Sequence, residues 1–564
     1  MNRIRSVLTF LIKHQLYSIF ILNLGVFLLF LLRNPFSSRT LIPNFEPFPD
    51  SIHYINPALS FLKGYGFKLE RQGRIISPAV PPLYSMVLVP FFVLYRDPRI
   101  FYFTNVVLSF LSLYLFFLII KKLTKNLWII GFCLFLFVTN YFFYWYPTLA
   151  MAENLMLPLF LYGVYLLVSA ISIRNTVCAA FITVSFYATK YASAPLMGSF
   201  FLMYFIKILY ESKNNKDRFR RQSYFLTSFF CFLMLFFLYD LMTKNSNIFS
   251  SLFDAAKTVG KKIIESVSFR PIQLSDVEKF SQSRAVYSPV HSSNNLPRYL
   301  KALRGGSEIF LWDSTPIVPF FIPLPAYLGL IWGLFKKKTR ILSFSLICMV
   351  FLSVYFISSF YTFDMRYIYH AIPSLLLGFA LFVSKLESLS RKRYYKIFFY
   401  TVFFGLCLFY LLTNIIRFKK QIMLNLKYSE TPWYYLAIVQ LNQYFKTVPS
   451  DGKNPLVISA HPPYFVDFYS NGNYDLLPLA PDQEFRDKKN LAWGPNNYSD
   501  LIVLYRKYID NGHDLFIQNS GLGNVAHLTG FYQTIKDNFD FVEVTEGCYN
   551  TCNIYKLNSK ETNH

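Results

Sequence analysis

Residues 101–120 read FYFTNVVLSFLSLYLFFLII, a run without a charged side chain. A helix that crosses the hydrocarbon core of a bilayer needs about 20 mostly apolar residues, which is the length of this run. Ten further apolar runs occur near residues 16–33, 127–146, 155–172, 176–189, 192–210, 223–241, 315–335, 341–360, 367–384 and 397–416. The sequence therefore predicts a mainly α polytopic membrane protein with about eleven transmembrane helices.

The composition supports the same class of protein. Of 564 residues, 54% are hydrophobic and 15% are charged, whereas soluble globular proteins are about 25% charged. Phe, Tyr and Trp make up 20% of the chain, and membrane-facing helices and their interfacial belts use these side chains freely. The composition excludes an ordinary soluble enzyme and a disordered protein.

The charge is distributed unevenly along the chain. The net charge of +25 would also suit a nucleic-acid-binding protein. However, residues 1–416 carry 42 Lys and Arg against 16 Asp and Glu, whereas residues 417–564 carry 14 against 15. The excess lies between the apolar runs, in clusters at Arg3, Arg5 and Lys13, at Lys121, Lys122 and Lys125, at Arg174, and within residues 213–221, 336–340 and 391–396.

Basic clusters of this kind mark the cytoplasmic ends of transmembrane helices. Alternating the helices from a cytoplasmic N-terminus places every cluster inside and the C-terminal residues outside. We therefore predict an integral protein of the bacterial inner (cytoplasmic) membrane with an extracytoplasmic, periplasmic C-terminal domain. The charge then reports topology, and nucleic acid is not expected as a partner.

The predicted topology defines two domains. Residues 1–416 form the transmembrane domain, with a first extracytoplasmic loop at about 34–100 and a long one at about 242–314, and residues 417–564 form a soluble domain. Within the first loop, residues 80–95 are apolar but short and contain three prolines. We interpret this run as lying on the outer membrane surface.

The C-terminal domain has the pattern of an α/β fold. Short apolar segments at residues 455–460, 514–518, 540–544 and 552–557 predict strands, and residues 500–510 predict a helix. Cys548 and Cys552 lie just before the last strand. In an oxidising compartment they would form a disulfide, and two unrelated free thiols are the alternative.

A candidate catalytic residue lies in the first loop, in FEPFPDSIHYINPALSFLKGYGF at residues 45–67. Asp50 follows two prolines and precedes an amphipathic stretch, which places it at or near a helix N-cap. It either caps the helix or, as a carboxylate at the membrane interface, deprotonates an acceptor hydroxyl. His53 and Tyr54 share its helical face.

Further polar residues stand at the outer ends of apolar runs, where charges are costly and often functional. Glu153 should meet a cation, a metal ion or water, or else reach the interface. Lys190 and Arg366 each begin a spanning run, and Arg71 and Arg74 lie in the first loop. One outward Arg is usually an interfacial anchor, whereas several cations around one cavity would suit a phosphate group.

Five motifs, taken in order, resemble one family. They are PDSIHYINPALSFLKGYGF at residues 49–67, SPAVPPLYSMVLVP at 77–90, AEN at 152–154, ATKYASAP at 188–195 and MRYIYHAIP at 365–373. Together they resemble the GT-C glycosyltransferases that use lipid-phosphate sugars. Within that superfamily they look most like the protein O-mannosyltransferase and lipid A aminoarabinose transferase group, similar to bacterial glycosyltransferase family 39. The resemblance covers about residues 10–415.

The resemblance implies roles for residues of this chain. The family has an acidic residue and then a Tyr in its first outer loop, matched by Asp50 and Tyr54. It has a second acidic residue where Glu153 stands, and an Arg-Tyr pair that matches Arg366 and Tyr367. Asp50 would be the catalytic base. The substrate-binding residues would be Tyr54, His53, Glu153, Lys190, Arg366, Tyr367, Arg71 and Arg74.

The resemblance also implies an activity. The protein would transfer a hexosyl or pentosyl group from a polyprenyl-phosphate donor to an envelope glycan, lipid or protein by inverting displacement. No cofactor is certain, and a divalent metal ion held by Asp50 or Glu153 stays open. A multi-pass transporter or lipid flippase is the alternative, because it also needs many helices and intramembrane charges.

Overall fold

The computed structural model describes residues 15–31, 33–37, 50–71, 74–76, 80–212, 214–242, 292–305, 317–358, 365–389, 393–426, 433–448, 454–459, 473–478, 498–519, 526–545 and 553–560. The chain forms two compact units. The first, called the helical unit below, comprises Met1–Pro35, Ser77–Arg96 and Ile100–Tyr428. The second unit comprises Phe36–Ile76, Asp97–Arg99 and Ser429–His564.

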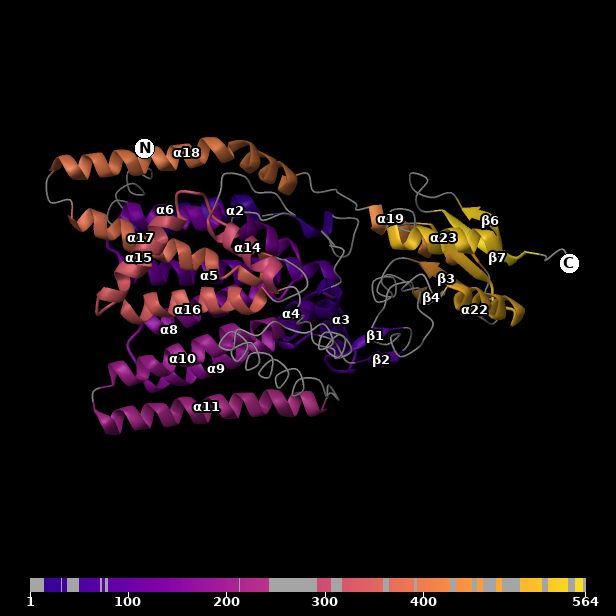
Figure 1. The fold of residues 1–564 in the computed structure, drawn as a ribbon, viewed down its shortest axis with the longest axis horizontal. Coiled ribbons are helices and arrows are strands. Elements are labelled where there is room, and N and C mark those ends of the chain that lie inside the picture. The colour runs from indigo at the N-terminus through magenta and orange to yellow at the C-terminus, as the bar shows by residue number, and fades with distance from the viewer. Residues whose placement is uncertain are drawn as a thin grey trace. The chain divides into compact units, whose positions relative to one another are not determined.

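A helix is present at each of the positions where an apolar run predicts one (Figure 1). In chain order these helices are α2 (Gln15–Leu31), α5 (Phe101–Leu123), α6 (Leu127–Val138) with α7 (Tyr141–Trp145), α8 (Glu153–Val168), α9 (Ile173–Thr189), α10 (Ala194–Glu211), α11 (Asn215–Met242), α15 (Pro323–Phe335), α16 (Arg340–Ile357), α17 (Ala371–Leu389) and α18 (Arg393–Leu426). The helical unit also contains α4 (Leu83–Leu94), α14 (Ser292–Leu303) and short 3-10 turns. The prediction of a polytopic membrane protein is confirmed.

Not every one of these helices reaches full spanning length. Among the described residues, 6 helices are long and apolar enough to cross a membrane, or 7 if the pair α6 and α7, bent by 55°, counts as one span. Helices α2, α8 and α15 are apolar but shorter. The sequence overestimates α15 because its apolar run contains Pro323, which begins the helix, a position that proline favours.

Helix α4 covers the short apolar run of the first loop. It has 12 residues and contains Pro90, so it is too short to span a bilayer. Its Tyr84 hydroxyl donates a hydrogen bond of 2.6 Å to Asn105 Oδ1 on α5. A helix of this length agrees with an interfacial element, and its place on the membrane surface stays a prediction.

Helices α15 and α17 pack through glycines. A Cβ atom added to Gly329 would overlap the carbonyl oxygen of Gly378, and one added to Gly378 would lie 2.6 Å from the carbonyl oxygen of Ala326. Small residues let helix backbones approach closely inside a membrane, where packing rather than the hydrophobic effect drives association.

The substitution Gly329→Ala is therefore expected to destabilise the helical unit by about 1–3 kcal/mol, because the added methyl group meets backbone that cannot move aside. Thermal unfolding of the detergent-solubilised protein measures the effect. Gly198→Ala on α10 is the matched control, since a Cβ there meets nothing within 4 Å. Equal melting temperatures for the two variants would contradict the packing argument.

The second unit begins with the first-loop residues. Helix α3 (Asp50–Leu62) confirms the predicted amphipathic helix, and Asp50 is its first residue. Gly64 and Gly66 follow with φ of 86° and 75°, which glycine adopts without steric cost. The chain then forms the antiparallel hairpin β1 (Leu69–Arg71) and β2 (Arg74–Ile76).

The C-terminal part of the second unit contains a five-stranded mixed sheet in the order β4-β3-β5-β7-β6. Strand β3 (Leu456–Ser459) pairs in parallel with β4 (Asp475–Pro478) and β5 (Leu515–Gln518). Strand β7 (Ile554–Ser559) runs antiparallel to β5 and to β6 (Phe539–Thr545). The four predicted strands are present, and β4 is an additional strand.

Three helices accompany this sheet: α19 (Trp433–Phe445), α22 (Tyr498–Asp510) and α23 (Ala526–Asn538). Only α22 was expected from the sequence. Gln518 Nε2 on β5 donates a hydrogen bond of 2.8 Å to the carbonyl oxygen of Ala437 on α19. Cys548 and Cys552, and therefore their predicted disulfide, lie outside the described residues.

The boundaries of the two units differ from the predicted division at residue 416. Helix α18 continues to Leu426, and the helical unit ends at Tyr428. The apolar pattern ends earlier than the helix, because Arg417, Lys419, Lys420 and Gln421 interrupt it within α18. In addition, residues 36–76 of the first loop group with the second unit.

Candidate functional site

A polar scaffold holds the backbone just before Glu153. Asn154 Nδ2 lies 2.9 Å from the carbonyl oxygen of Leu149 and 3.1 Å from that of Met151. From α5, Asn105 Nδ2 donates to the same Leu149 carbonyl at 2.8 Å. Buried polar groups that satisfy one another in this way rigidify their surroundings. The start of α8, and with it Glu153, is therefore fixed in place.

Glu153 forms a buried ion pair with Lys190. The carboxylate Oε1 accepts a short hydrogen bond from Lys190 Nζ, and the two side chains are 4% and 16% exposed. Lys190 caps the C-terminus of α9, so the pair joins the ends of two helices. A buried carboxylate needs such a partner, because leaving it uncompensated is strongly destabilising.

An Arg-Tyr pair lies beside this ion pair. Arg366 and Tyr367 belong to the 3-10 turn Met365–Ile368, and Arg366 is buried. Lys190 Nζ lies 4.5 Å from the centre of the Tyr367 ring, and the Arg366 guanidinium carbon lies 6.0 Å from it. Both cations thus lie within range of a cation–π interaction with this ring.

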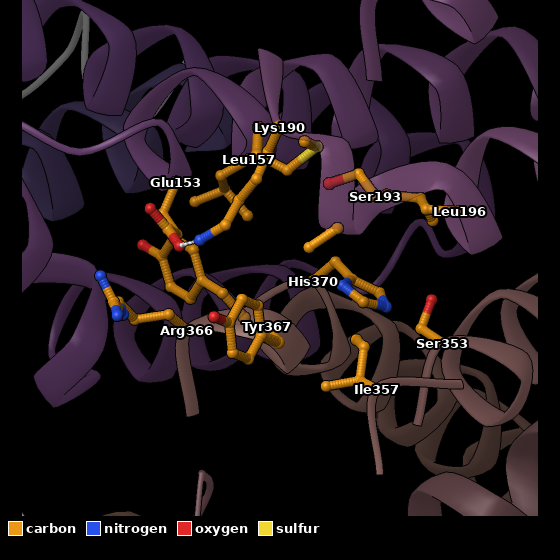
Figure 2. A pocket seen from close by; sticks show the side chains of 13 residues that line it. Glu153, Leu157, Lys190, Ser193, Leu196, Ser353, Ile357, Arg366, Tyr367 and His370 are labelled. Atoms are coloured by element: carbon orange, nitrogen blue, oxygen red, sulfur yellow. Dashed lines mark hydrogen bonds and ion pairs between the residues drawn. The ribbon is translucent and has the colours of Figure 1, made fainter. Parts of the chain in front are cut away.

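These side chains line one cavity of about 20 Å³, shown in Figure 2. Its walls come from α8, the end of α9, the start of α10, α16 and the turn before α17. The lining residues are Glu153, Met156, Leu157, Lys190, Ala192, Ser193, Leu196, Ser353, Ile357, Arg366, Tyr367, Tyr369 and His370. A cavity of this size holds one water molecule or one group of similar size.

The structure brings together four of the predicted site residues, Glu153, Lys190, Arg366 and Tyr367, which lie far apart in the sequence. The sequence predicted a cation as one of the possible partners of Glu153, and Lys190 is such a cation.

The other five predicted site residues belong to the second unit. His53 is half-buried and Tyr54 is buried on α3. Arg71 and Arg74 face each other in the register of the β1–β2 hairpin. The side chains of these two arginines and of Asp50 lie outside the described atoms. The catalytic role of Asp50 and the binding roles of the others stay predictions.

Sequence reasoning missed several residues of the cavity. His370 follows Arg366 by four positions within the motif at residues 365–373, so its place in that motif was an available signal. Ser353 lies inside the apolar run of α16 and Ser193 within a short turn. An isolated hydroxyl in an apolar helix carries no functional signal, because it commonly bonds the carbonyl one turn back.

The sequence does not decide whether the protein binds a metal ion. Within the part of the chain that the structure describes, no group of three or more His, Cys, Asp and Glu side chains could hold a metal ion. The Glu153 carboxylate has Lys190 as its counter-ion. A divalent ion held by Asp50 or Glu153 stays a prediction.

Comparison with known proteins gives no match by sequence: no family model and no curated protein matches the chain. Solved structures do match. ArnT from Cupriavidus metallidurans bound to undecaprenyl phosphate aligns with a TM-score of 0.56 and 10% identity over 96% of this chain and 98% of that one. The chain has the GT-C fold.

A second protein with the GT-C fold supports this assignment. The archaeal oligosaccharyltransferase AglB from Archaeoglobus fulgidus, in complex with an inhibitory peptide and a dolichol-phosphate, aligns with a TM-score of 0.53 and 9% identity. The alignment covers 98% of this chain and 75% of AglB. The resemblance to GT-C enzymes stated from the motifs is thus confirmed for the fold.

Proposed function

We propose that this integral membrane protein is a glycosyltransferase that moves a sugar from a polyprenyl-phosphate donor to an extracytoplasmic acceptor. The observation that carries the proposal is the cavity in which Lys190 and Arg366 lie beside the same aromatic ring. Two proteins with the same fold bind undecaprenyl phosphate and dolichol-phosphate. The acceptor class would be an envelope glycan, a lipid or a protein.

The charge of the cavity favours an anionic ligand. Of its lining side chains, Lys190 and Arg366 are positive and Glu153 is negative. A phosphate group is larger than this cavity of about 20 Å³, so it would bind beside the cavity. There it would gain charge-assisted hydrogen bonds from both cations, and the planar guanidinium can bind two phosphate oxygens at once. Glu153 would keep the Lys190 ammonium in position for this contact.

The proposed reaction is a direct displacement at the anomeric carbon. The acceptor oxygen forms a bond to this carbon while the bond to the phosphate oxygen breaks, which inverts the configuration. The acceptor proton passes to the Asp50 carboxylate as general base. The electron pair leaves with the polyprenyl phosphate, whose charge Lys190 and Arg366 stabilise.

Mass spectrometry of envelope glycans in a strain lacking the protein tests this proposal. Loss of one sugar substituent, restored by the wild-type protein, is the expected result. An unchanged glycan profile, together with lipid or solute movement by the purified protein in liposomes, would favour the transporter or flippase instead.

The orientation follows from the basic clusters and can be tested separately. Alkaline phosphatase, which is active only outside the cytoplasm, should be active when fused after residue 428 and inactive when fused after residue 340. The reason is that Arg340 ends a basic cluster, which is retained on the cytoplasmic side. The reverse pattern of activity would place the C-terminal residues in the cytoplasm.

A further inference from the structure

Two buried polar atoms of the cavity have no role in the ion pair. His370 Nε2 and Ser353 Oγ are fully covered, and neither has a hydrogen-bond partner among the residues that the structure describes. Both residues line the cavity and come from different elements, His370 from the turn before α17 and Ser353 from α16 (Figure 2). Buried polar atoms are nearly always paired in native proteins, so these two point to a missing partner.

The orientation of the imidazole is fixed by its surroundings. Its ring centre lies 5.4 Å from that of Phe160, and the ring lies near the backbone of Met349. A neutral imidazole that donates through Nδ1 has an acceptor at Nε2. In that tautomer the cavity contains an acceptor at His370 Nε2 and a hydroxyl at Ser353.

The size and position of the cavity limit what the partner can be. About 20 Å³ accommodates one water molecule or one hydroxyl group, and not a sugar ring. The same cavity is lined by Lys190 and Arg366, which bind phosphate in the proposed function. In a polyprenyl-phosphate sugar the first ring is bonded directly to the phosphate, so its hydroxyl groups lie within a few bonds of these cations.

We propose that His370 and Ser353 form a subsite for one hydroxyl group of the donor sugar. This hydroxyl donates its hydrogen to His370 Nε2 and accepts one from Ser353 Oγ. The inference rests on the proposed function and adds a specificity determinant to it. A donor without this hydroxyl leaves both buried atoms unpaired, and a site built for a hydroxyl rejects such analogues strongly.

Binding of defined lipids to the purified full-length protein tests the subsite. The probes are undecaprenyl phosphate without a sugar, undecaprenyl phosphomannose and undecaprenyl phosphoglucose. Wild-type protein should bind at least one of the sugar lipids more tightly than the bare phosphate. His370→Asn retains a polar group near Met349 but lacks the atom at the Nε2 position. It should weaken the preferred sugar lipid about tenfold and leave the affinity for the bare phosphate unchanged.

Two further variants guard against a folding defect. His370→Gln places an amide near the Nε2 position and should retain part of the preference, and Ser353→Ala should lose part of it. Ser345→Ala is the matched control, because Ser345 is also a buried serine of α16 whose Oγ has no hydrogen-bond partner within the described part of the chain, but it does not line the cavity. Its sugar preference should equal that of the wild type.

The possible results distinguish a failure of the subsite hypothesis from a failure of the proposed function. If His370→Asn and Ser353→Ala keep the wild-type preference, the cavity holds only an ordered water and the subsite is wrong. Equal binding of all three lipids by the wild type also overturns it, while leaving the phosphate site intact. Failure of the wild type to bind even the bare undecaprenyl phosphate would instead contradict the proposed function.

Discussion

Replacing Asp50 by Asn is expected to lower the rate of sugar transfer by about 10²- to 10⁴-fold, the usual contribution of a general base. Asn has nearly the same shape as Asp but cannot accept the acceptor's proton. Because Asp50 is the first residue of α3, where Asn is also an accepted cap, folding and membrane insertion should be preserved. Initial rates with a polyprenyl-phosphate sugar donor measure the effect.

Asp97→Asn is the matched control for this prediction. Asp97 also belongs to the predicted first loop, and its carboxylate is paired with Arg99. Its replacement should leave transfer close to the wild-type rate. Near-wild-type activity of the Asp50→Asn protein would remove Asp50 from the reaction, whatever the control shows.

Replacing Lys190 by Met is expected to cost about 3–5 kcal/mol of stability, because it leaves the Glu153 carboxylate buried without its cation. Adding Glu153→Gln should restore most of the stability, since the buried charge is then gone. Transfer should stay strongly impaired in the double variant, because the phosphate has lost one of its two cations. Thermal unfolding and initial rates measure the two effects independently.

A second ion pair, in which the lysine is buried and the glutamate is exposed, provides the control for this prediction. Lys207 is bonded to Glu211 at 2.9 Å on α10, and neither residue lines the cavity. The double variant Lys207→Met with Glu211→Gln should be stable and should keep its activity. If the double variant of Lys190 and Glu153 is also fully active, that pair has only a structural role.

The helices could be predicted because the bilayer imposes one simple rule, that a spanning segment must be apolar and helical. The run at residues 101–120 meets this rule and forms α5. Prediction was poorer where local signals conflict. In α15 the apolar run is longer than the helix, and β4 is a four-residue strand that ends in Pro478, a residue depleted from strand interiors.

The site was only partly visible in the sequence. Charged residues stand out in apolar surroundings, so Glu153, Lys190 and Arg366 could be selected. Their convergence could not be derived, because it depends on how α8, α9 and the turn before α17 pack. His370 and Ser353 were missed for another reason: their significance lies in unpaired buried atoms, which only three-dimensional contacts reveal.

The most direct test of the central claim is a transfer reaction with the purified protein in lipid nanodiscs. The donor is a polyprenyl-phosphate sugar labelled in the sugar, and the acceptor is an envelope extract from a strain lacking the protein. We predict that label moves to an acceptor with release of polyprenyl phosphate, and that Asp50→Asn prevents both. Lack of transfer by the wild type from every polyprenyl-phosphate sugar supplied, despite a correctly folded protein, would contradict the assignment as a glycosyltransferase.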